Sequence, residues 1–519
     1  MTLPNGWFRQ IPPTPAFPAK LPHPPLPGAV NRLAAIRLQG LRFFRRLRTP
    51  SRFDVRVSKA SLAAIALLAA LTLAWFGLLG ARLYGRQSGF ATAFLLGSSF
   101  LYFVMGHVLT LDMTVSMFLF LGMACLVLAQ RERGRPACAR WMWLGWAALA
   151  GAILTKGAIG VVLPGAAVLL YSLWQRDWAL WRHLELGKGL LLLLALTAPW
   201  FVAVSLHNPE FAWFFFVREH VLRFATNEAH RTAPIWIFVP VLLLGSLPWT
   251  VTWLRSVLQP GFPWRPGTGG FSPERLLWVF AATVFVFFSA SSSKLAPYIL
   301  PAFAPLAVLA GRHLALRGDR FMLPLALLSA LALTTLDWVA DAAPLVLFPV
   351  DALEAYADYL HLAAVLMVLA GLSTLSMRPG QTLRLGLTTL LVLVTLQTVL
   401  WSARAGEPSR SSRALADSIL AEGLQQADIY VVGDYYPQSL PFYLGRAVDL
   451  VVVTDELEVG IGEQPARWFG TLGEFSRHWS AEPRAYAVMG KVYFRALQSS
   501  GLPMRVLLQG PRLVVVSRE

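Results

Sequence analysis

A few charged residues stand at the ends of long apolar runs, where burial of a charge is costly unless the charge is paired or used. Arg218, His220 and Arg223 cluster with Glu219 in the stretch Phe211–Phe224, between two such runs. In a helix, Glu219 and Arg223 would be four residues apart and able to pair. The cluster predicts either a phosphate- or substrate-binding site or an interfacial anchor, in which Arg and His reach the membrane surface among aromatic residues.

Asp112 and Lys156 stand at the ends of two other apolar runs. Asp112 follows Thr110 and either caps a helix and complements its dipole, or faces a cavity where it accepts a proton or binds a sugar hydroxyl. Lys156 lies in the tight turn Leu154–Gly160, and its ammonium either neutralises a lipid phosphate or simply extends to the membrane surface. Both residues therefore carry a functional and a purely structural interpretation.

Lys294 and Tyr298 belong to a more specific stretch, Ser289–Pro301, which is rich in hydroxyls. Serine and lysine donors suit a diphosphate or phosphodiester, and Tyr298 offers a hydroxyl or a ring face. No glycine-rich nucleotide-binding loop accompanies these residues. The pattern predicts a lipid-linked phosphate substrate, because cationic side chains stabilise a phosphate that departs from an anomeric carbon.

The elements that position these residues are predicted to be membrane helices. The chain has 519 residues, of which 56% are hydrophobic and only 14% charged. This composition excludes a soluble globular protein of that size. The net charge of +17 is dispersed among the apolar runs, which fits contacts with membrane lipids and argues against nucleic acid as a partner. The two cysteines indicate neither a disulfide framework nor a cysteine-based metal site.

About twelve apolar runs of spanning length follow one another from residue 61 to residue 403, the predicted transmembrane domain. They are 61–80, 89–107, 112–129, 142–157, 160–175, 186–206, 236–254, 276–291, 297–311, 321–341, 359–376 and 385–402. Every second loop is rich in Lys and Arg, which predicts that these basic loops are cytoplasmic. Asp112, Lys156, Lys294 and the 207–235 loop then lie on the external face.

The two ends of the chain differ from this pattern. Residues 1–60 are Pro-rich and then basic, with eleven Lys and Arg, although the alternation of loops would place them outside. Residues 404–519 contain one helical pattern at 415–424 and strand-like runs at 428–433, 449–454, 485–489 and 512–517. The sequence therefore predicts an α-helical polytopic membrane protein with a small external α/β domain at its C-terminus.

Five motifs in this order resemble the bacterial ArnT-like glycosyltransferases, which are GT-C enzymes related to the protein O-mannosyltransferases. The motifs are Thr110-Leu-Asp-Met113, Leu154-Thr-Lys-Gly157, Arg218-Glu-His-Val-Leu-Arg-Phe224, Leu247-Pro-Trp249 and Ser293-Lys-Leu-Ala-Pro-Tyr-Ile-Leu-Pro301. The resemblance covers residues 57–402, and the family also carries a small periplasmic α/β domain.

The resemblance implies a bacterial inner-membrane enzyme whose site faces the periplasm. Such an enzyme transfers a sugar, typically aminoarabinose, from undecaprenyl phosphate to an acceptor such as a lipid A phosphate, with inversion. Another amino sugar or a hexose is the alternative. By the same resemblance, Asp112 is a catalytic acidic position, and Arg223 and Lys294 are phosphate contacts. The residue types and positions of Lys156, Arg218 and Tyr298 predict that they also contact the substrate phosphate. No cofactor is required, although His220 matches a position near a divalent metal.

One part of the family pattern is missing from the sequence. The family begins with a span and a periplasmic loop that carry Asp-Glu-x-x-Tyr and Glu-Lys-Pro-Pro motifs, and neither motif is present here. We expect that residues 1 to about 55 come from a wrong start or a shifted reading frame. The missing motifs leave open a family member without catalytic activity. Independently of them, a transporter or flippase for lipid-linked glycans is a competing function, because it would also need many spans and cationic phosphate contacts.

Overall fold

The fold is taken from a computed structural model. In the helical part the structure describes residues 55–108, 110–209, 211–222, 233–258, 264–265, 270–318, 322–335, 353–375, 378–379 and 381–402. In the C-terminal part it describes residues 411–422, 427–433, 435–453, 457, 461–462, 464–482, 484–510 and 512–518. Most of the first predicted segment, up to residue 54, therefore lies outside the described residues.

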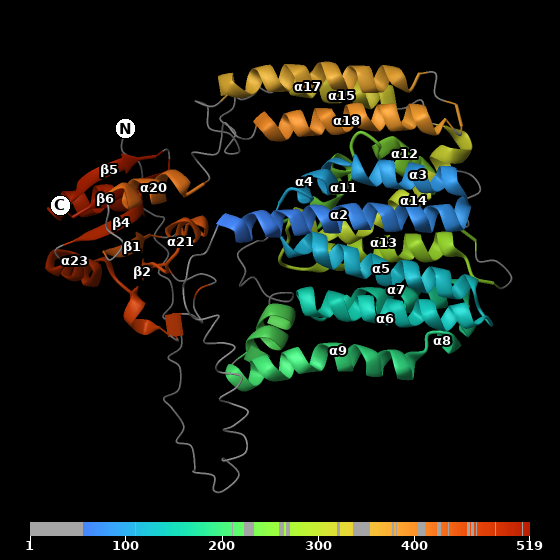
Figure 1. The fold of residues 1–519 in the computed structure, drawn as a ribbon, viewed down its shortest axis with the longest axis horizontal. Coiled ribbons are helices and arrows are strands. Elements are labelled where there is room, and N and C mark those ends of the chain that lie inside the picture. The colour runs from blue at the N-terminus through green and yellow to red at the C-terminus, as the bar shows by residue number, and fades with distance from the viewer. Residues whose placement is uncertain are drawn as a thin grey trace, which may run out of the picture. The chain divides into compact units, whose positions relative to one another are not determined.

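Long helices make up the first part of the chain (Figure 1). Among the described residues, the first eight are α2 (Val55–Tyr84), α3 (Arg86–Gly97), α4 (Phe100–Met105), α5 (Leu111–Arg131), α6 (Pro136–Lys156), α7 (Ile159–Gln175), α8 (Ala179–Arg182) and α9 (Leu186–His207). After them come η1 (Trp213–Leu222), η2 (Ile235–Ile237), α11 (Phe238–Gly245), α12 (Thr250–Leu258), α13 (Pro273–Ala290), η3 (Ala296–Ile299), α14 (Leu300–Arg317), α15 (Met322–Thr334), α17 (Leu353–Ser373) and α18 (Thr382–Ser402). The predicted class, a polytopic helical membrane protein, is confirmed.

The described helices that could each cross a membrane are fewer than the twelve predicted spans. Each of the twelve apolar runs overlaps a described helix or helix pair, although part of the run 321–341 lies outside the described residues. Within the described residues, however, seven helices are long and apolar enough to cross a membrane, or eight if the bent pair α11–α12 is one span. Helix α7 and the apolar parts of α15 and α17 are shorter. The count of twelve spans therefore remains a prediction.

Helices α5 and α6 form an antiparallel hairpin around Gly134, whose φ of 78° closes the turn. The two helices approach closely because glycines face each other: a Cβ on Gly145 would lie 3.5 Å from the Gly122 carbonyl oxygen and 3.3 Å from Cys125 Cβ. Small residues at such contacts let membrane helices pack backbone to backbone. In this antiparallel register, the first turn of α5 lies beside the last turn of α6.

Two helix breaks inside the bundle are stabilised by each other. Helices α3 and α4 are separated at Ser98–Ser99, and α11 and α12 meet at 112° across a break that contains Trp249. The buried Trp249 indole donates to Ser98 Oγ at 2.8 Å, and the Phe100 N–H donates to the Leu247 carbonyl at 3.0 Å. Each break exposes polar groups that an apolar surrounding would leave unsatisfied. Here the break at Ser98–Ser99 and the break at Trp249 supply each other's hydrogen-bond partners.

The basic loops gather at one end of the helical bundle. Hydrogen bonds and ion pairs join loops that are distant in sequence: Arg131–Arg82 carbonyl (2.8 Å), Arg133–Asp177 (2.6 Å), Gln175–Gly270 carbonyl (2.8 Å) and Arg312–Glu274 (2.8 Å). Helix α5 begins beside Asp112 and ends at Arg131 in this basic group. Asp112 therefore lies at the opposite end, roughly 30 Å away for a helix that rises 1.5 Å per residue.

The C-terminal part contains one six-stranded sheet in the order β3-β2-β1-β4-β6-β5. The strands are β1 (Asp428–Val432), β2 (Asp449–Val451), β3 (Trp468–Phe469), β4 (Ala485–Gly490), β5 (Arg505–Gln509) and β6 (Leu513–Ser517); the first four run parallel, and β6 is antiparallel to β4 and to β5. The helices are α20 (Arg413–Ala421), α21 (Ser439–Leu444), α23 (Leu472–Ala481) and α24 (Lys491–Ser499), with the short turn η7 at Pro465–Arg467.

Both faces of this sheet are covered, as the continuous apolar run of its central strand β1 requires. Ile429 and Val431 pack with residues of α20 and α21, whereas Tyr430 and Val432 pack with residues of α23 and α24. The predicted α/β class of this part is confirmed. The exact boundaries 1–60, 61–403 and 404–519 remain predictions.

Candidate functional site

Asp112 and Lys156 form an ion pair at the end of the α5–α6 hairpin that lies away from the basic loops. Asp112 is in the first turn of α5 and Lys156 is the last residue of α6, where Gly157 with φ 77° ends the helix. Each charge thus has the sign that its own helix dipole favours. The side chains are 13% and 28% exposed, so the pair is largely withdrawn from solvent yet still reachable.

Tyr298 brings a second segment to this pair. It lies in η3, just before α14, and the Lys156 ammonium is 4.5 Å from the centroid of its ring. A cation over an aromatic face is held by the ring quadrupole. The other side of the ring packs on Phe288, with centroids 5.1 Å apart. Asp112, Lys156 and Tyr298, which the sequence offers as three separate candidates, therefore meet in one place.

Lys294 stands on the same connection as Tyr298, between α13 and η3. It is half-buried, and its ammonium donates to the Ser291 carbonyl. That bond holds the lysine side chain against its own loop, on the segment that also supplies the Tyr298 ring. A lysine in this position presents a second positive charge at the end of the bundle where Lys156 lies.

Several hydroxyls of these segments are buried without a hydrogen-bond partner. Among the described residues, Thr110 Oγ1, Ser289 Oγ and Ser293 Oγ are in this state. Buried polar groups are normally satisfied, so an unsatisfied group calls for an explanation such as a bound ligand or water. Thr110 directly precedes α5, and the two serines flank the α13 terminus. Sequence reasoning did not single out Thr110 by itself; its place before Asp112 is the only signal.

Arg218 belongs to a different element, the π-helix η1. Its guanidinium lies 5.7 Å from the centroid of the Phe214 ring, next to an aromatic group that joins η1 to α9 through Phe201 and Phe215. The α-helical spacing assumed for this stretch does not apply to Trp213–Leu222, because a π-helix bonds each residue to the fifth one along. Arg223 and the side chain of His220 lie outside the described residues, so their predicted roles stay predictions.

The metal predicted near His220 also stays a prediction. In the part of the chain that the structure describes, no group of three or more His, Cys, Asp or Glu side chains comes together.

Two family descriptions match the chain. "Dolichyl-phosphate-mannose-protein mannosyltransferase" matches residues 47–215, and "Aminoarabinose transferase C-terminal domain" matches residues 415–518. The first match includes Asp112 and Lys156, and the second covers the six-stranded sheet. Both descriptions are of glycosyltransferase families, one matching the helical part and the other the C-terminal sheet.

Curated relatives include undecaprenyl phosphate-alpha-4-amino-4-deoxy-L-arabinose arabinosyl transferases. The protein of this name from Erwinia tasmaniensis is 34% identical over 250 residues, which are 47% of this chain and 43% of the relative. A second, from Proteus mirabilis, is 34% identical over 277 residues, which are 52% and 47% of the two chains. These matches therefore span less than half of each relative's length.

Solved structures match over a larger share of the chain. The crystal structure of ArnT from Cupriavidus metallidurans bound to undecaprenyl phosphate has a TM-score of 0.79 and 30% identity, over 88% of this chain and 84% of that chain. The apo state of the same protein gives a TM-score of 0.77 and 29% identity, over 88% and 83%. The likeness in three dimensions thus includes most of both molecules.

Proposed function

This chain belongs to the ArnT family of glycosyltransferases, and on that premise we propose that it transfers a sugar from undecaprenyl phosphate to an acceptor such as a lipid A phosphate. Aminoarabinose is the sugar that the names of the relatives support, and another amino sugar or a hexose is the alternative. The binding of undecaprenyl phosphate by the similar Cupriavidus protein supports the donor.

The observation that carries this proposal is the meeting of Asp112, Lys156 and Tyr298 at one end of the helical bundle. A half-buried ammonium, that of Lys156, is held in a fixed position by a carboxylate and by an aromatic face. A cation whose position is set before the substrate arrives stabilises developing charge without reorganisation. Lys294 and the unsatisfied hydroxyls of Thr110, Ser289 and Ser293 add donors on the same segments.

The reaction breaks the bond between the anomeric carbon and the donor phosphate oxygen. Undecaprenyl phosphate leaves with the bonding electron pair, and an acceptor oxygen forms the new bond from the opposite face, which inverts the configuration. Lys156 and Lys294 neutralise the charge that gathers on the leaving phosphate, and Arg218 and Arg223 are further candidates for phosphate contacts. The proposal thus assigns phosphate binding to the cationic residues.

Asp112 has a role that depends on the acceptor. A phosphate acceptor is already anionic at neutral pH, so its oxygen attacks without losing a proton to a base. Asp112 then orients Lys156 and binds a sugar hydroxyl. A hydroxyl acceptor, by contrast, would lose its proton as it attacks, and Asp112 is the carboxylate available on these segments to receive it.

The site is proposed to face the periplasm of a bacterial inner membrane. The contacts among the basic loops support a cytoplasmic location for that end of the bundle, because short cytoplasmic loops are enriched in Lys and Arg. Asp112, at the far end of α5, then reaches the opposite face. The α/β part after residue 404 follows the last span and is proposed to be periplasmic as well.

A transfer assay with three lysine variants tests this function. The purified full chain is incubated with undecaprenyl-phosphate-linked aminoarabinose and lipid A, and the product is measured as a mass increase of lipid A. Lys156→Met and Lys294→Met should each lower turnover by about 10²- to 10³-fold, as does loss of an electrostatic donor at other active sites. Lys188→Met is the matched control, since Lys188 is 70% exposed and pairs with Glu185 among the basic loops.

The results of this assay test both the proposed function and the proposed site. The proposed site is supported if the unmodified chain and Lys188→Met both transfer the sugar while Lys156→Met and Lys294→Met do not. Equal activity in Lys156→Met and Lys188→Met would contradict the role of Lys156. Absence of transfer from every sugar donor tried, with folded protein, would contradict the function itself.

A further inference from the structure

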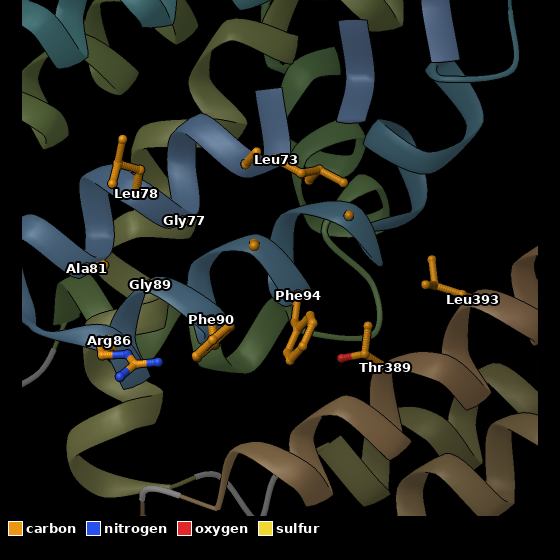
Figure 2. A pocket seen from close by; sticks show the side chains of 13 residues that line it. Leu73, Gly77, Leu78, Ala81, Arg86, Gly89, Phe90, Phe94, Thr389 and Leu393 are labelled. Atoms are coloured by element: carbon orange, nitrogen blue, oxygen red, sulfur yellow. The ribbon is translucent and has the colours of Figure 1, made fainter. Parts of the chain in front are cut away.

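An apolar groove lies on the helical bundle between α2, α3 and α18, and it does not involve the candidate site. Its volume is about 620 Å³. The lining includes Leu73 and Leu78 from α2, Phe90 and Phe94 from α3, and Leu393 from α18 (Figure 2). Leu78 and Phe90 are strongly exposed, so the groove opens onto the outer apolar surface of the bundle.

One cation stands at the end of this groove. Arg86 is the first residue of α3, follows the positive-φ Gly85, and extends beside the lining residues (Figure 2). No side chain caps this helix terminus, and an arginine there adds a positive charge to the positive end of the helix dipole. The arrangement is unfavourable alone and becomes favourable when an anion, such as a phosphate, occupies the terminus.

A polar group inside the groove provides a second, independent observation. Thr389 of α18 lines the groove, is only 4% exposed, and its hydroxyl has no hydrogen-bond partner in the described part of the chain. Most threonines of this helix bond the carbonyl four residues earlier, as Thr388, Thr395 and Thr398 do. The Thr389 hydroxyl is thus available to an acceptor that the groove admits.

The length of the groove matches one leaflet of a membrane. Its α3 wall runs from Arg86 to Gly97, which spans roughly 16 Å at 1.5 Å per residue. That is about half of a hydrocarbon core of roughly 30 Å. Arg86 directly follows the connection between α2 and α3, and the last turn of α2 contacts the other basic loops, because Arg131 donates to the Arg82 carbonyl. The groove therefore begins at the basic membrane face and ends near the middle of the membrane.

We propose that this groove binds an anionic glycerophospholipid of the leaflet beside the basic loops. Its phosphodiester pairs with Arg86 and the N-terminus of α3, one acyl chain lies along Leu78, Phe90 and Phe94, and an ester carbonyl accepts from Thr389. Basic sites between membrane helices bind such headgroups in the same physical way. This site is separate from sugar transfer.

Lipid-dependent stability of the purified full chain tests the proposal. Phosphatidylglycerol and phosphatidylcholine with identical acyl chains are titrated in detergent, and binding is followed by the thermal midpoint and by native mass spectrometry. Phosphatidylglycerol should bind more tightly, and Arg86→Gln should weaken it at least roughly fivefold, the value of about one contact between arginine and an anionic lipid. Arg86→Lys should restore part of the preference.

Two matched controls define the site. Arg140→Gln removes the same charge from an exposed position of α6 outside the groove and should leave binding unchanged. Ala74→Trp fills the groove and should abolish bound lipid, whereas Ala70→Trp, one turn away on α2 and also exposed, should not.

Four results would overturn the proposal. They are equal binding of both lipids, equal loss in Arg86→Gln and Arg140→Gln, competition by undecaprenyl phosphate but not by phosphatidylglycerol, and a dimer that Ala74→Trp dissociates. The third would assign the groove to a polyprenyl lipid, and the fourth to a second copy of the chain.

Discussion

At the scale of single residues, the pairing of Asp112 with Lys156 changes how both are interpreted. A carboxylate in a first helical turn and a lysine in a last turn are each ordinary alone. Together, 44 residues apart in sequence, they form an ion pair that is mostly withdrawn from solvent. Such pairs are costly to break, because loss of one partner leaves the other charge buried. The pair fixes the lysine ammonium beneath Tyr298.

A double-mutant cycle measures that coupling. Asp112→Asn and Lys156→Met should each destabilise the folded protein, and the double variant should lose less than the sum of the two. We expect a coupling free energy of roughly 0.5–3 kcal/mol, as for residues in direct contact. Thermal unfolding of the four proteins in the same detergent provides the measurement.

The partly exposed ion pair Arg413–Asp417 serves as reference, since its atoms are 3.7 Å apart and both side chains are about two-thirds exposed. The corresponding cycle there should give a coupling near zero. Additive effects of Asp112→Asn and Lys156→Met would show that the two residues stabilise the fold independently.

The residues of the site could be named from the sequence, but not their arrangement. Asp112, Lys156, Lys294 and Tyr298 stand out because polar groups are rare near apolar runs. Their meeting depends on the register of the α5–α6 hairpin and on where η3 lies, and the second of these is set by packing between distant segments. Gly134, midway between Asp112 and Lys156, is the one sequence signal for the hairpin register.

At the scale of elements, close helix contacts depend on individual glycines. Gly189 and Gly187 lie in the first turn of α9, two residues apart. A Cβ on Gly189 would lie 2.0 Å from Trp146 Nε1, which donates to the Leu184 carbonyl at 2.9 Å. A Cβ on Gly187 would meet nothing within 4 Å. The two positions therefore form a natural matched pair.

Alanine at these positions should have opposite effects on stability. Gly189→Ala displaces the Trp146 ring and should cost about 1–3 kcal/mol, the usual cost of overpacking. Gly187→Ala should be neutral or stabilise by up to about 1 kcal/mol, because alanine favours the helix. Thermal midpoints in detergent distinguish them, and a Gly189→Ala protein as stable as the unmodified chain would contradict the α6–α9 packing.

The helices themselves are well predicted from the sequence, whereas their interruptions are not. A long apolar run indicates a membrane helix because the backbone must satisfy its own hydrogen bonds there. The same run does not reveal the breaks at Ser98–Ser99 and Ser246–Trp249, since the groups that stabilise each break come from the other. The π-helical form of Trp213–Leu222 is likewise not indicated by the residue pattern of this stretch.

At the scale of the whole molecule, the orientation in the membrane is open to direct test. The native cysteines, Cys125 and Cys138, are buried, so introduced cysteines can be labelled in their presence. Arg135→Cys places one in an exposed basic loop, and Gln498→Cys places one on an exposed face of α24. An impermeant maleimide added to spheroplasts should label Gln498→Cys and should label Arg135→Cys only after permeabilisation. The reverse pattern would invert the proposed topology.

The C-terminal sheet is predicted in its centre and missed at its edges. Strands β1, β2, β4 and β6 coincide with apolar β-branched runs, because a strand covered on both faces is apolar throughout. Strand β3 has only two residues, and β5 is mostly exposed, so neither carries that pattern. The family resemblance, by contrast, is confirmed over most of the chain by the Cupriavidus structure.

The paired helix breaks have a consequence for how this protein changes over generations. Ser98 and Trp249 are 151 residues apart, yet a hydrogen bond between them makes the structure of each break depend on the other. A substitution that straightens one of the two broken helices leaves the polar groups of the other break without hydrogen-bond partners in an apolar environment. A change that remodels one break is therefore expected to require a compensating change at the other, so the two breaks should vary together.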